Sequence, residues 1–73
     1  MNPKRYPVVI ERTNTGFSAY SPDVAGCAAE GRTEEETRHN FQEALEFHLE
    51  GMKLFGERIP EPSCSVDYVE VTA

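Results

Sequence analysis

The feature that most constrains the fold is one long amphipathic helix, predicted for residues 33–55. Apolar side chains recur there at spacings of three and four residues, which places them on one stripe of a helix of about five turns. The stripe consists of Thr37, Phe41, Ala44, Leu45, His48, Leu49, Met52 and Phe55. Because such a stripe must be buried against a second layer, the rest of the chain has to supply that layer.

Both ends of this helix carry recognisable capping residues. Thr33 and Glu36 have the spacing of a capping box, in which the Thr33 hydroxyl accepts from the Glu36 amide and the Glu36 carboxylate accepts from the Thr33 amide. Glu34 and Glu35 are favoured by the positive end of the helix dipole. Gly56 is suited to a left-handed C-terminal cap, so the helix is expected to end by Phe55.

Strands are predicted on both sides of the helix. Residues 6–12 and 17–21 are rich in β-branched and aromatic residues. They are joined by Thr13–Gly16, in which Asn14 and Gly16 tolerate positive φ, so we expect a hairpin. Pro22 and Asp23 favour a turn before a third strand at residues 27–31. Residues 65–71 have the composition of a final strand.

The predicted architecture is α+β with the order β-β-β-α-β. We expect a three-stranded antiparallel meander, a parallel fourth strand beside the first, and one helix packed on one face of the sheet. The alternation of strand residues points Val8 and Ile10 to one face and Val9 to the other. Because nothing in the chain covers that second face, we expect a homodimer or a larger assembly.

Length and composition favour one small domain over residues 1–73. A chain of 73 residues buries only about 60% of the surface that its unfolded form exposes, so its own core is small. The net charge of −6 argues against direct binding of nucleic acid and suits a basic partner, although it also serves solubility alone. With no apolar run that could span a membrane and no export signal, we expect a cytoplasmic protein with reduced thiols at Cys27 and Cys64.

The sequence indicates no catalytic residues, no metal ligands and no cofactor. The carboxylates that could resemble a two-metal nuclease site are Glu11, Glu43, Glu46, Asp67 and Glu70. They are better explained as solvated residues, because Glu11 ends its strand and the helix glutamates lie off the apolar stripe. His39 and His48 are expected on opposite sides of the helix, and Cys27 has no neighbouring base, so we predict a protein that is not an enzyme.

One group of residues carries a resemblance to a known family. Seven residues stand at characteristic spacings within residues 17–33, followed by the glutamate-rich helix start and later by IPEPS. They are Phe17, Pro22, Asp23, Gly26, Cys27, Gly31 and Thr33. The chain is similar over residues 6–71 to the HicB family of antitoxins, whose domain resembles a truncated ribonuclease H fold.

This resemblance implies a binding function. HicB-type antitoxins mask HicA-type toxins, which are small basic ribonucleases that cut mRNA. The implied partner is therefore such a toxin, and we expect Asp23, Glu30, Glu34 and Glu35 to contact it. Structural roles are assigned to Gly16, Pro22, Gly26, Cys27, Gly31, Thr33, Glu36 and Gly56.

Two further expectations concern the extent of this function. Full-length family members usually add a C-terminal DNA-binding module, which we expect to be missing here because the sequence ends at Ala73. The alternative to an antitoxin is an orphan HicB-like domain that serves as a homo-oligomeric scaffold or ligand-binding module without a toxin. The sequence does not separate the two.

Overall fold

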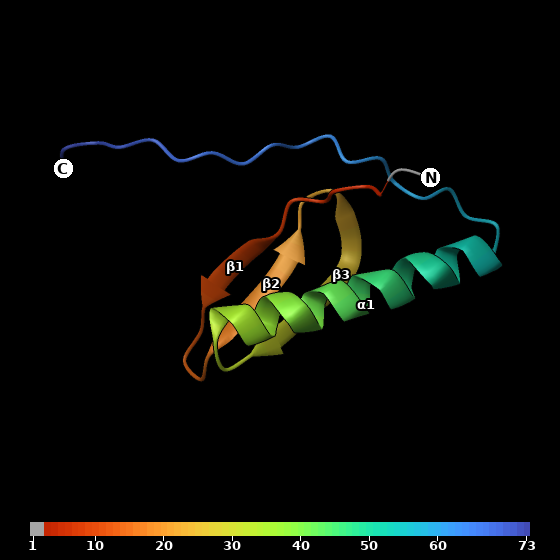
Figure 1. Ribbon diagram of the computed structural model, residues 1–73, viewed down its shortest axis with the longest axis horizontal. Helices are drawn as coiled ribbons and strands as arrows, with labels where there is room; N and C mark the ends of the chain where they lie inside the picture. Colours follow the sequence, from red (N-terminus) through yellow and green to blue (C-terminus); the bar gives the residue numbers. More distant parts are fainter. Residues whose placement is uncertain (1–2) are drawn as a thin grey trace.

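The computed structural model describes residues 3–73, which contain three strands and one helix packed in two layers (Figure 1). The strands are β1 (Val9–Arg12), β2 (Phe17–Ser21) and β3 (Val24–Gly31), and the helix is α1 (Glu34–Leu54). The sheet has the order β1-β2-β3 with antiparallel neighbours. The α+β class, the meander and the single helix on one face are therefore confirmed, and the third strand begins three residues earlier than predicted.

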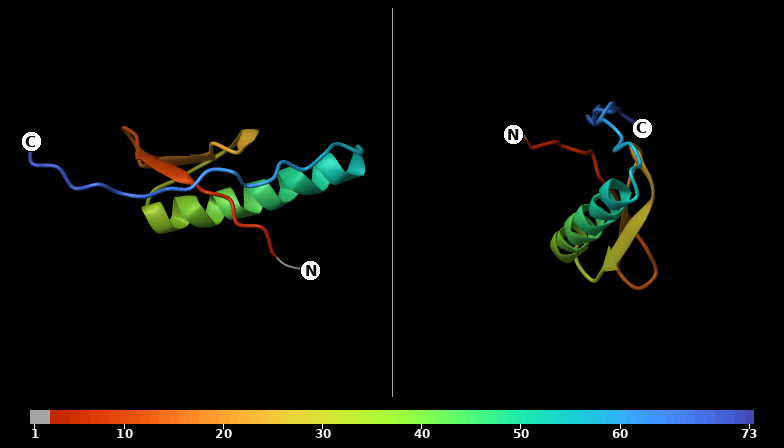
Figure 2. Two further views of the ribbon diagram at one scale, coloured as in Figure 1. Left: turned by 90° about the horizontal axis from the view of Figure 1, so that it is seen from above. Right: turned by 90° about the vertical axis from the view of Figure 1, so that its right-hand side faces the viewer.

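The register of the sheet separates a helix-facing side from an outer side. Ala19 pairs with Ile10 on β1 and with Ala29 on β3, and it is almost fully buried under α1. The next cross-strand row points the opposite way and consists of Val9, Tyr20 and Ala28. The helix covers only one side of the sheet, so this outer row lies uncovered in the single chain (Figure 2).

The core is small and lies between β3 and the first half of α1. Its buried apolar members are Ala19, Val24, Cys27 and Phe41. Partly buried residues pack around them, namely Tyr6, Val8, Ile10, Ala29, Ala44 and Leu45. The predicted stripe is confirmed at its start, whereas the prediction is wrong for Phe55, which is 84% exposed because α1 extends beyond the sheet.

The start of α1 is fixed by its cap and by close contact with the end of β3. Thr33 Oγ1 accepts from the Glu36 amide at 3.0 Å, which confirms half of the capping box. Within the described residues the Thr33 amide does not donate to the Glu36 carboxylate. Thr37 is fully buried, and its hydroxyl donates to the Thr33 carbonyl at 2.7 Å. A Cβ on Gly31 would lie only 2.6 Å from Thr37 Oγ1, so glycine is needed at that strand end.

The end of α1 has the predicted glycine cap. Gly56 has φ +70 and donates to the carbonyl of Lys53 at 3.1 Å, while the amide of Glu57 donates to the carbonyl of Met52 at 2.8 Å. This pair of bonds is the Schellman motif, which satisfies carbonyls of the last helical turn. The predicted role of Gly56 is confirmed.

The predicted hairpin of β1 and β2 is confirmed, but its turn does not use positive φ. Among the described residues only Gly26 (φ +80) and Gly56 have positive φ, so neither Asn14 nor Gly16 uses that conformation. Gly16 is required for a different reason, because a Cβ there would overlap the carbonyl oxygen of Gly31 on β3. Gly26 supplies the left-handed residue instead, near the irregular start of β3.

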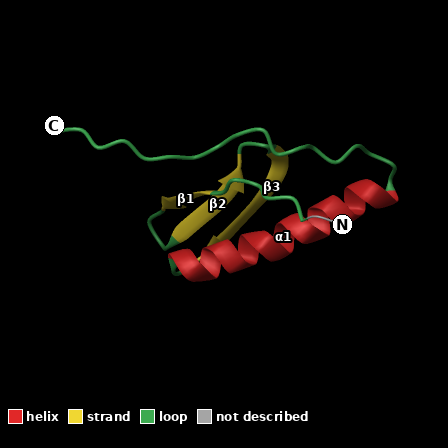
Figure 3. Cartoon of the chain, turned by 45° about the horizontal axis from the view of Figure 1, so that its top comes forward, coloured by secondary structure: helices red, strands yellow, loops and turns green. Residues whose placement is uncertain are grey.

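The structure also differs at the fourth strand. Residues 57–73, called the tail below, are extended but unpaired, and the sheet of the described chain stops at three strands (Figure 3). The expected parallel pairing of residues 65–71 with β1 is not formed, because the tail crosses the end of the sheet and then continues away from it (Figure 1). The local composition favours an extended strand, but it does not determine where that strand finds its hydrogen-bond partner.

Candidate partner-binding surfaces

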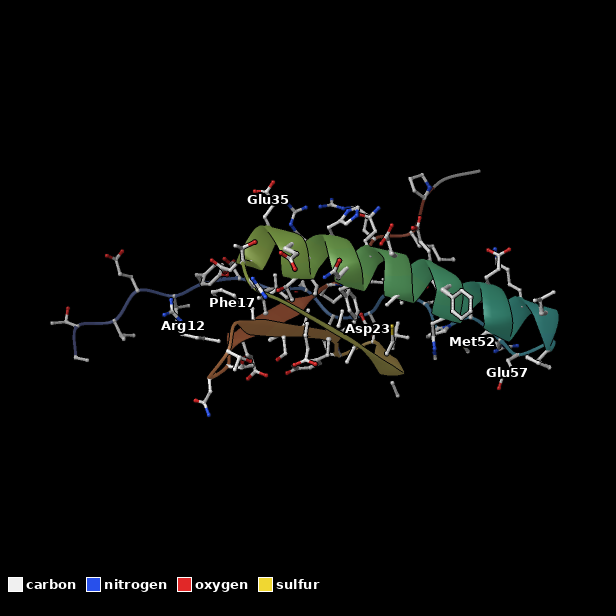
Figure 4. All side chains as sticks on the ribbon, turned by 90° about the horizontal axis from the view of Figure 1, so that it is seen from below. Arg12, Phe17, Asp23, Glu35, Met52 and Glu57 are labelled. Carbon is white, nitrogen blue, oxygen red and sulfur yellow. The ribbon has the colours of Figure 1, made fainter. Side chains whose placement is uncertain are left out.

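The first acidic surface is the start of α1. Glu34, Glu35 and Glu36 occupy its first turn and are all exposed. Figure 4 shows Glu35 projecting away from the sheet. Three carboxylates on one helical turn are stabilised by the helix dipole and leave negative charge facing solvent, where it can attract a cationic partner.

A second acidic site lies on the outer side of the sheet. Glu30 on β3 and Glu11 on β1 both stand opposite Ser18, so the two glutamates flank that small residue on one face. Both side chains are exposed. Of these two glutamates, only Glu30 is predicted from the sequence as a partner contact. Glu11 joins the same row through the strand register, which depends on pairing between residues far apart in the chain.

Asp23 has a different environment from the glutamates. Its carboxylate accepts from the Ser63 amide at 3.0 Å, the Ser63 hydroxyl at 2.9 Å and the Cys64 amide at 3.1 Å. These bonds, first the one from the Cys64 amide, lower the pKa of Asp23 to about 2 from its ordinary 3.8. We call this set of three hydrogen bonds the Asp23 clamp, which fixes the tail to the turn between β2 and β3.

The four residues predicted as partner contacts therefore do not form one cluster. Asp23 and the acidic helix start lie at opposite ends of β3, whose eight residues span about 25 Å. Glu30 lies near the helix start, where its carbonyl accepts from Asn40 Nδ2 at 2.9 Å, but its side chain faces the outer side of the sheet. A partner that contacts all four would have to wrap around the domain.

An apolar groove runs between the start of β3 and the second half of α1. It is lined by apolar and small residues that include Cys27, Ala28, Phe47, Met52 and Phe55. Phe47 and Phe55 are more than 80% exposed in the single chain. The position of Met52 on this part of the helix is visible in Figure 4.

The two thiols are not activated as nucleophiles. Cys27 is buried, and the loss of hydration raises the pKa of its thiol. Cys64 is exposed, but its hydrogen bond to the Asp23 carboxylate raises the pKa of its thiol as well. Both groups therefore stay protonated at neutral pH, and neither is suited to covalent catalysis.

The imidazoles have separate surroundings. His39 forms an exposed i,i+4 contact with Glu43, with 3.6 Å between Nε2 and Oε2. His48 instead lies over Gly26, where an added Cβ would meet its Cε1 at 3.9 Å. Within residues 3–73 no three His, Cys, Asp or Glu side chains are grouped as a metal site would require, and no helix of that range is long and apolar enough to cross a membrane.

The combination of this sheet and this helix occurs in a known family. Residues 6–72 match the family model of the HicB-like antitoxin of bacterial toxin–antitoxin systems. The chain belongs to that family. The resemblance drawn from residues 17–33 is thereby confirmed.

Relatives of this HicB-like chain come from a phage and an archaeon. An uncharacterized 14.9 kDa protein in the rep-hol intergenic region of Haemophilus phage HP1 is 39% identical over 64 residues, which are 88% of this chain and 48% of that protein. The chain thus spans about half the length of the phage protein. A UPF0150 protein of Thermoplasma acidophilum is 32% identical over 57 residues, which are 77% of this chain and 83% of that protein.

A solved structure is similar as well. A chain of a HicA3 and HicB3 toxin–antitoxin complex superposes with a TM-score of 0.72 at 35% identity. The match covers 82% of the HicB-like chain and 70% of the solved one. The arrangement of three strands and one helix is thus shared with a protein from a toxin–antitoxin pair.

Proposed function

We propose that this HicB-like chain is an antitoxin that binds and masks a small basic toxin of the HicA type, and that it acts without catalysis. The observation that carries the proposal is the family match over residues 6–72. The structural likeness to a chain of a HicA3 and HicB3 complex supports it. A cytoplasmic location follows from this proposal, because the toxin's mRNA substrate lies there.

The distribution of charge fits a basic partner. The chain carries a net charge of −6, and the acidic helix start concentrates three exposed carboxylates on one turn. Such a surface accelerates the encounter with a cationic protein and orients it. We therefore assign Glu34 and Glu35 as toxin contacts, with Glu30 as a further contact on the outer side of the sheet.

We assign Asp23 the role of holding the tail rather than of contacting the toxin. Its carboxylate already accepts three hydrogen bonds from the tail, so binding a toxin cation there would compete with the Asp23 clamp. We expect Asp23 to influence partner binding through the position of the tail.

The test is a charge reversal with a matched control on the same helix. In the test variant Glu34 and Glu35 are changed to Lys, and in the control Glu46 and Glu50 receive the same change. Both pairs are exposed, and they lie about 18 Å apart along α1. Each variant is co-expressed with the small basic protein encoded in the neighbouring reading frame, and growth rescue and the association rate are measured.

The proposal expects the two reversals to behave differently. The test variant should stay folded, fail to rescue growth and associate about tenfold or more slowly at low salt, whereas the control should rescue like the parent. Equal rescue by the two folded variants would show that the acidic helix start is not a toxin contact. Failure of the unchanged chain to bind that neighbouring protein would contradict the antitoxin function itself.

A second candidate function is supported by the exposed apolar surface. The tail and the groove leave several large apolar side chains in water, which suits a homo-oligomeric scaffold without a toxin. Stable self-assembly together with the absence of a small basic neighbouring reading frame would favour this alternative.

A further inference from the structure

The tail makes the single chain extended for its length. The radius of gyration is 13.9 Å, and the longest dimension is 47 Å. A compact domain of 73 residues is expected to have a radius of gyration of about 11 Å. The last residues of the tail, which run past the sheet in Figure 1 and in the left view of Figure 2, contribute to this excess.

The projecting part of the tail has the β-branched and aromatic residues of a strand. Tyr68 is 92% exposed and Val69 88% exposed, and Val66 and Val71 are also largely exposed. Because successive strand residues point to opposite faces, Val66 and Tyr68 would lie on one face and Val69 and Val71 on the other. Each face thus carries two large apolar residues and one carboxylate, Glu70 or Asp67, a pattern that is suited to an edge strand.

The beginning of the tail is fixed to the body of the domain. Lys4 Nζ forms an ion pair with Glu61 at 2.8 Å, and the Tyr6 hydroxyl donates to the Pro60 carbonyl at 2.6 Å. The Asp23 clamp then holds residues 63 and 64. The strand-forming residues after the clamp are therefore directed outward from a defined point.

The sheet offers one regular free edge. β1 and β3 are both edge strands, but β3 begins irregularly, with a register shift opposite Tyr20 and Ser21 and positive φ at Gly26. Such irregularity impairs the pairing of an incoming strand. β1 lacks these interruptions, and the extended residues 6–8 that precede it pack against the core.

We propose that residues 65–71 of the tail add to the free edge of β1 in a second copy of this chain, so that two copies exchange their last strands. Each copy contains one unpaired strand and one unpaired edge, and a two-fold arrangement satisfies both at once. This exchange places a fourth strand beside β1, but it comes from the other copy. The proposal does not depend on toxin binding.

The second copy is the occupant that the geometry favours. Both components of the pairing are present in every chain, and the tail of the single chain passes the end of its own sheet without pairing (Figure 1). Pairing would also bring one of the two apolar pairs onto the side of the sheet that α1 covers and so remove two large apolar side chains per copy from water, a gain for a domain whose described core has four buried apolar residues.

The test combines the assembly state with contacts between differently labelled copies. Wild-type chain is compared in sedimentation velocity with Val69→Pro, which removes an amide donor from the exchanged strand, and with Thr72→Pro, which makes the same change outside residues 65–71. In a mixture of isotope-labelled and unlabelled wild-type copies, nuclear Overhauser effects between copies are recorded for the methyl groups of Val69 and Val71.

Strand exchange predicts a wild-type dimer at micromolar concentration, with contacts from the valine methyls of one copy to β1 of the other. Because each dimer contains two exchanged strands, Val69→Pro should raise the dissociation constant about a hundredfold, and Thr72→Pro should leave it nearly unchanged. The proposal would be overturned by a monomeric wild type or by a Val69→Pro dimer of unchanged stability. It would also be overturned if the tail made contacts only within its own copy, or paired only with an added toxin.

Discussion

Two glycine-to-alanine substitutions should change stability in opposite directions, although each adds the same methyl group. At Gly31 the new Cβ would lie 2.6 Å from Thr37 Oγ1 and 2.8 Å from Thr37 N. Thr37 is fully buried and bonded to the Thr33 carbonyl, so it cannot move aside. At Gly51, in the last turn of α1, no atom other than the adjacent residues and the nearby helix backbone lies within 4 Å of the added atom.

The expected magnitudes follow from these surroundings. Overpacking at Gly31 should lower the free energy of unfolding by about 1–3 kcal/mol. Gly51→Ala should raise it by about 0.5–1 kcal/mol, because alanine has the higher helix propensity and loses less backbone entropy. For a domain of this size, each 1 kcal/mol corresponds to a shift in melting temperature of about 4–8 °C.

Thermal and urea unfolding, followed by circular dichroism, would measure both changes. The protein concentration must be the same for all variants, because self-association makes the melting temperature depend on it. A Gly31→Ala variant as stable as the parent would refute the close packing at the end of β3. A destabilised Gly51→Ala variant would refute the open surroundings assigned to the second half of the helix.

Three further predictions concern the cap, the clamp and the core. Thr33→Ala should lower the free energy of unfolding by about 1 kcal/mol in urea titrations, because the Glu36 amide loses its acceptor. Since the pKa of Asp23 is lowered from 3.8 to about 2, the clamp should be intact above pH 4 and weaken as the pH falls toward 2. The chemical shift of the Cys64 amide would report this change, and Asp23→Asn should abolish it. Phe41→Ala should lower the free energy of unfolding by about 3–5 kcal/mol and so lower the melting temperature, whereas the same change at the exposed Phe47 should leave the melting temperature nearly unchanged.

The features that could be predicted from the sequence are those set by nearby residues. The Thr33 cap depends on a partner three residues away, and the stripe that is buried at Thr37 and Phe41 depends on helical spacing. The left-handed Gly56 follows from the helix end just before it. Each of these interactions is contained within one or two turns of chain, so composition and spacing are enough to indicate it.

The features that were missed depend on residues far apart in the chain. Asp23 was correctly placed in a turn, but its partners at positions 63 and 64 are forty residues away. Glu11 joins Glu30 on one face only through the register of two strand pairs. The β-branched residues of 65–71 predict a last strand, but the structure forms none there, because a strand needs an edge to pair with and composition does not specify that edge.

The Asp23 clamp also fixes the point from which the rest of the tail projects. The nine residues beyond it, extended, reach about 30 Å from a pivot held by three hydrogen bonds. A rotation of about 10° at the pivot would displace the tip by roughly 5 Å, which is close to the distance between neighbouring strands. A change in the turn between β2 and β3 would therefore move the tip by about one strand spacing.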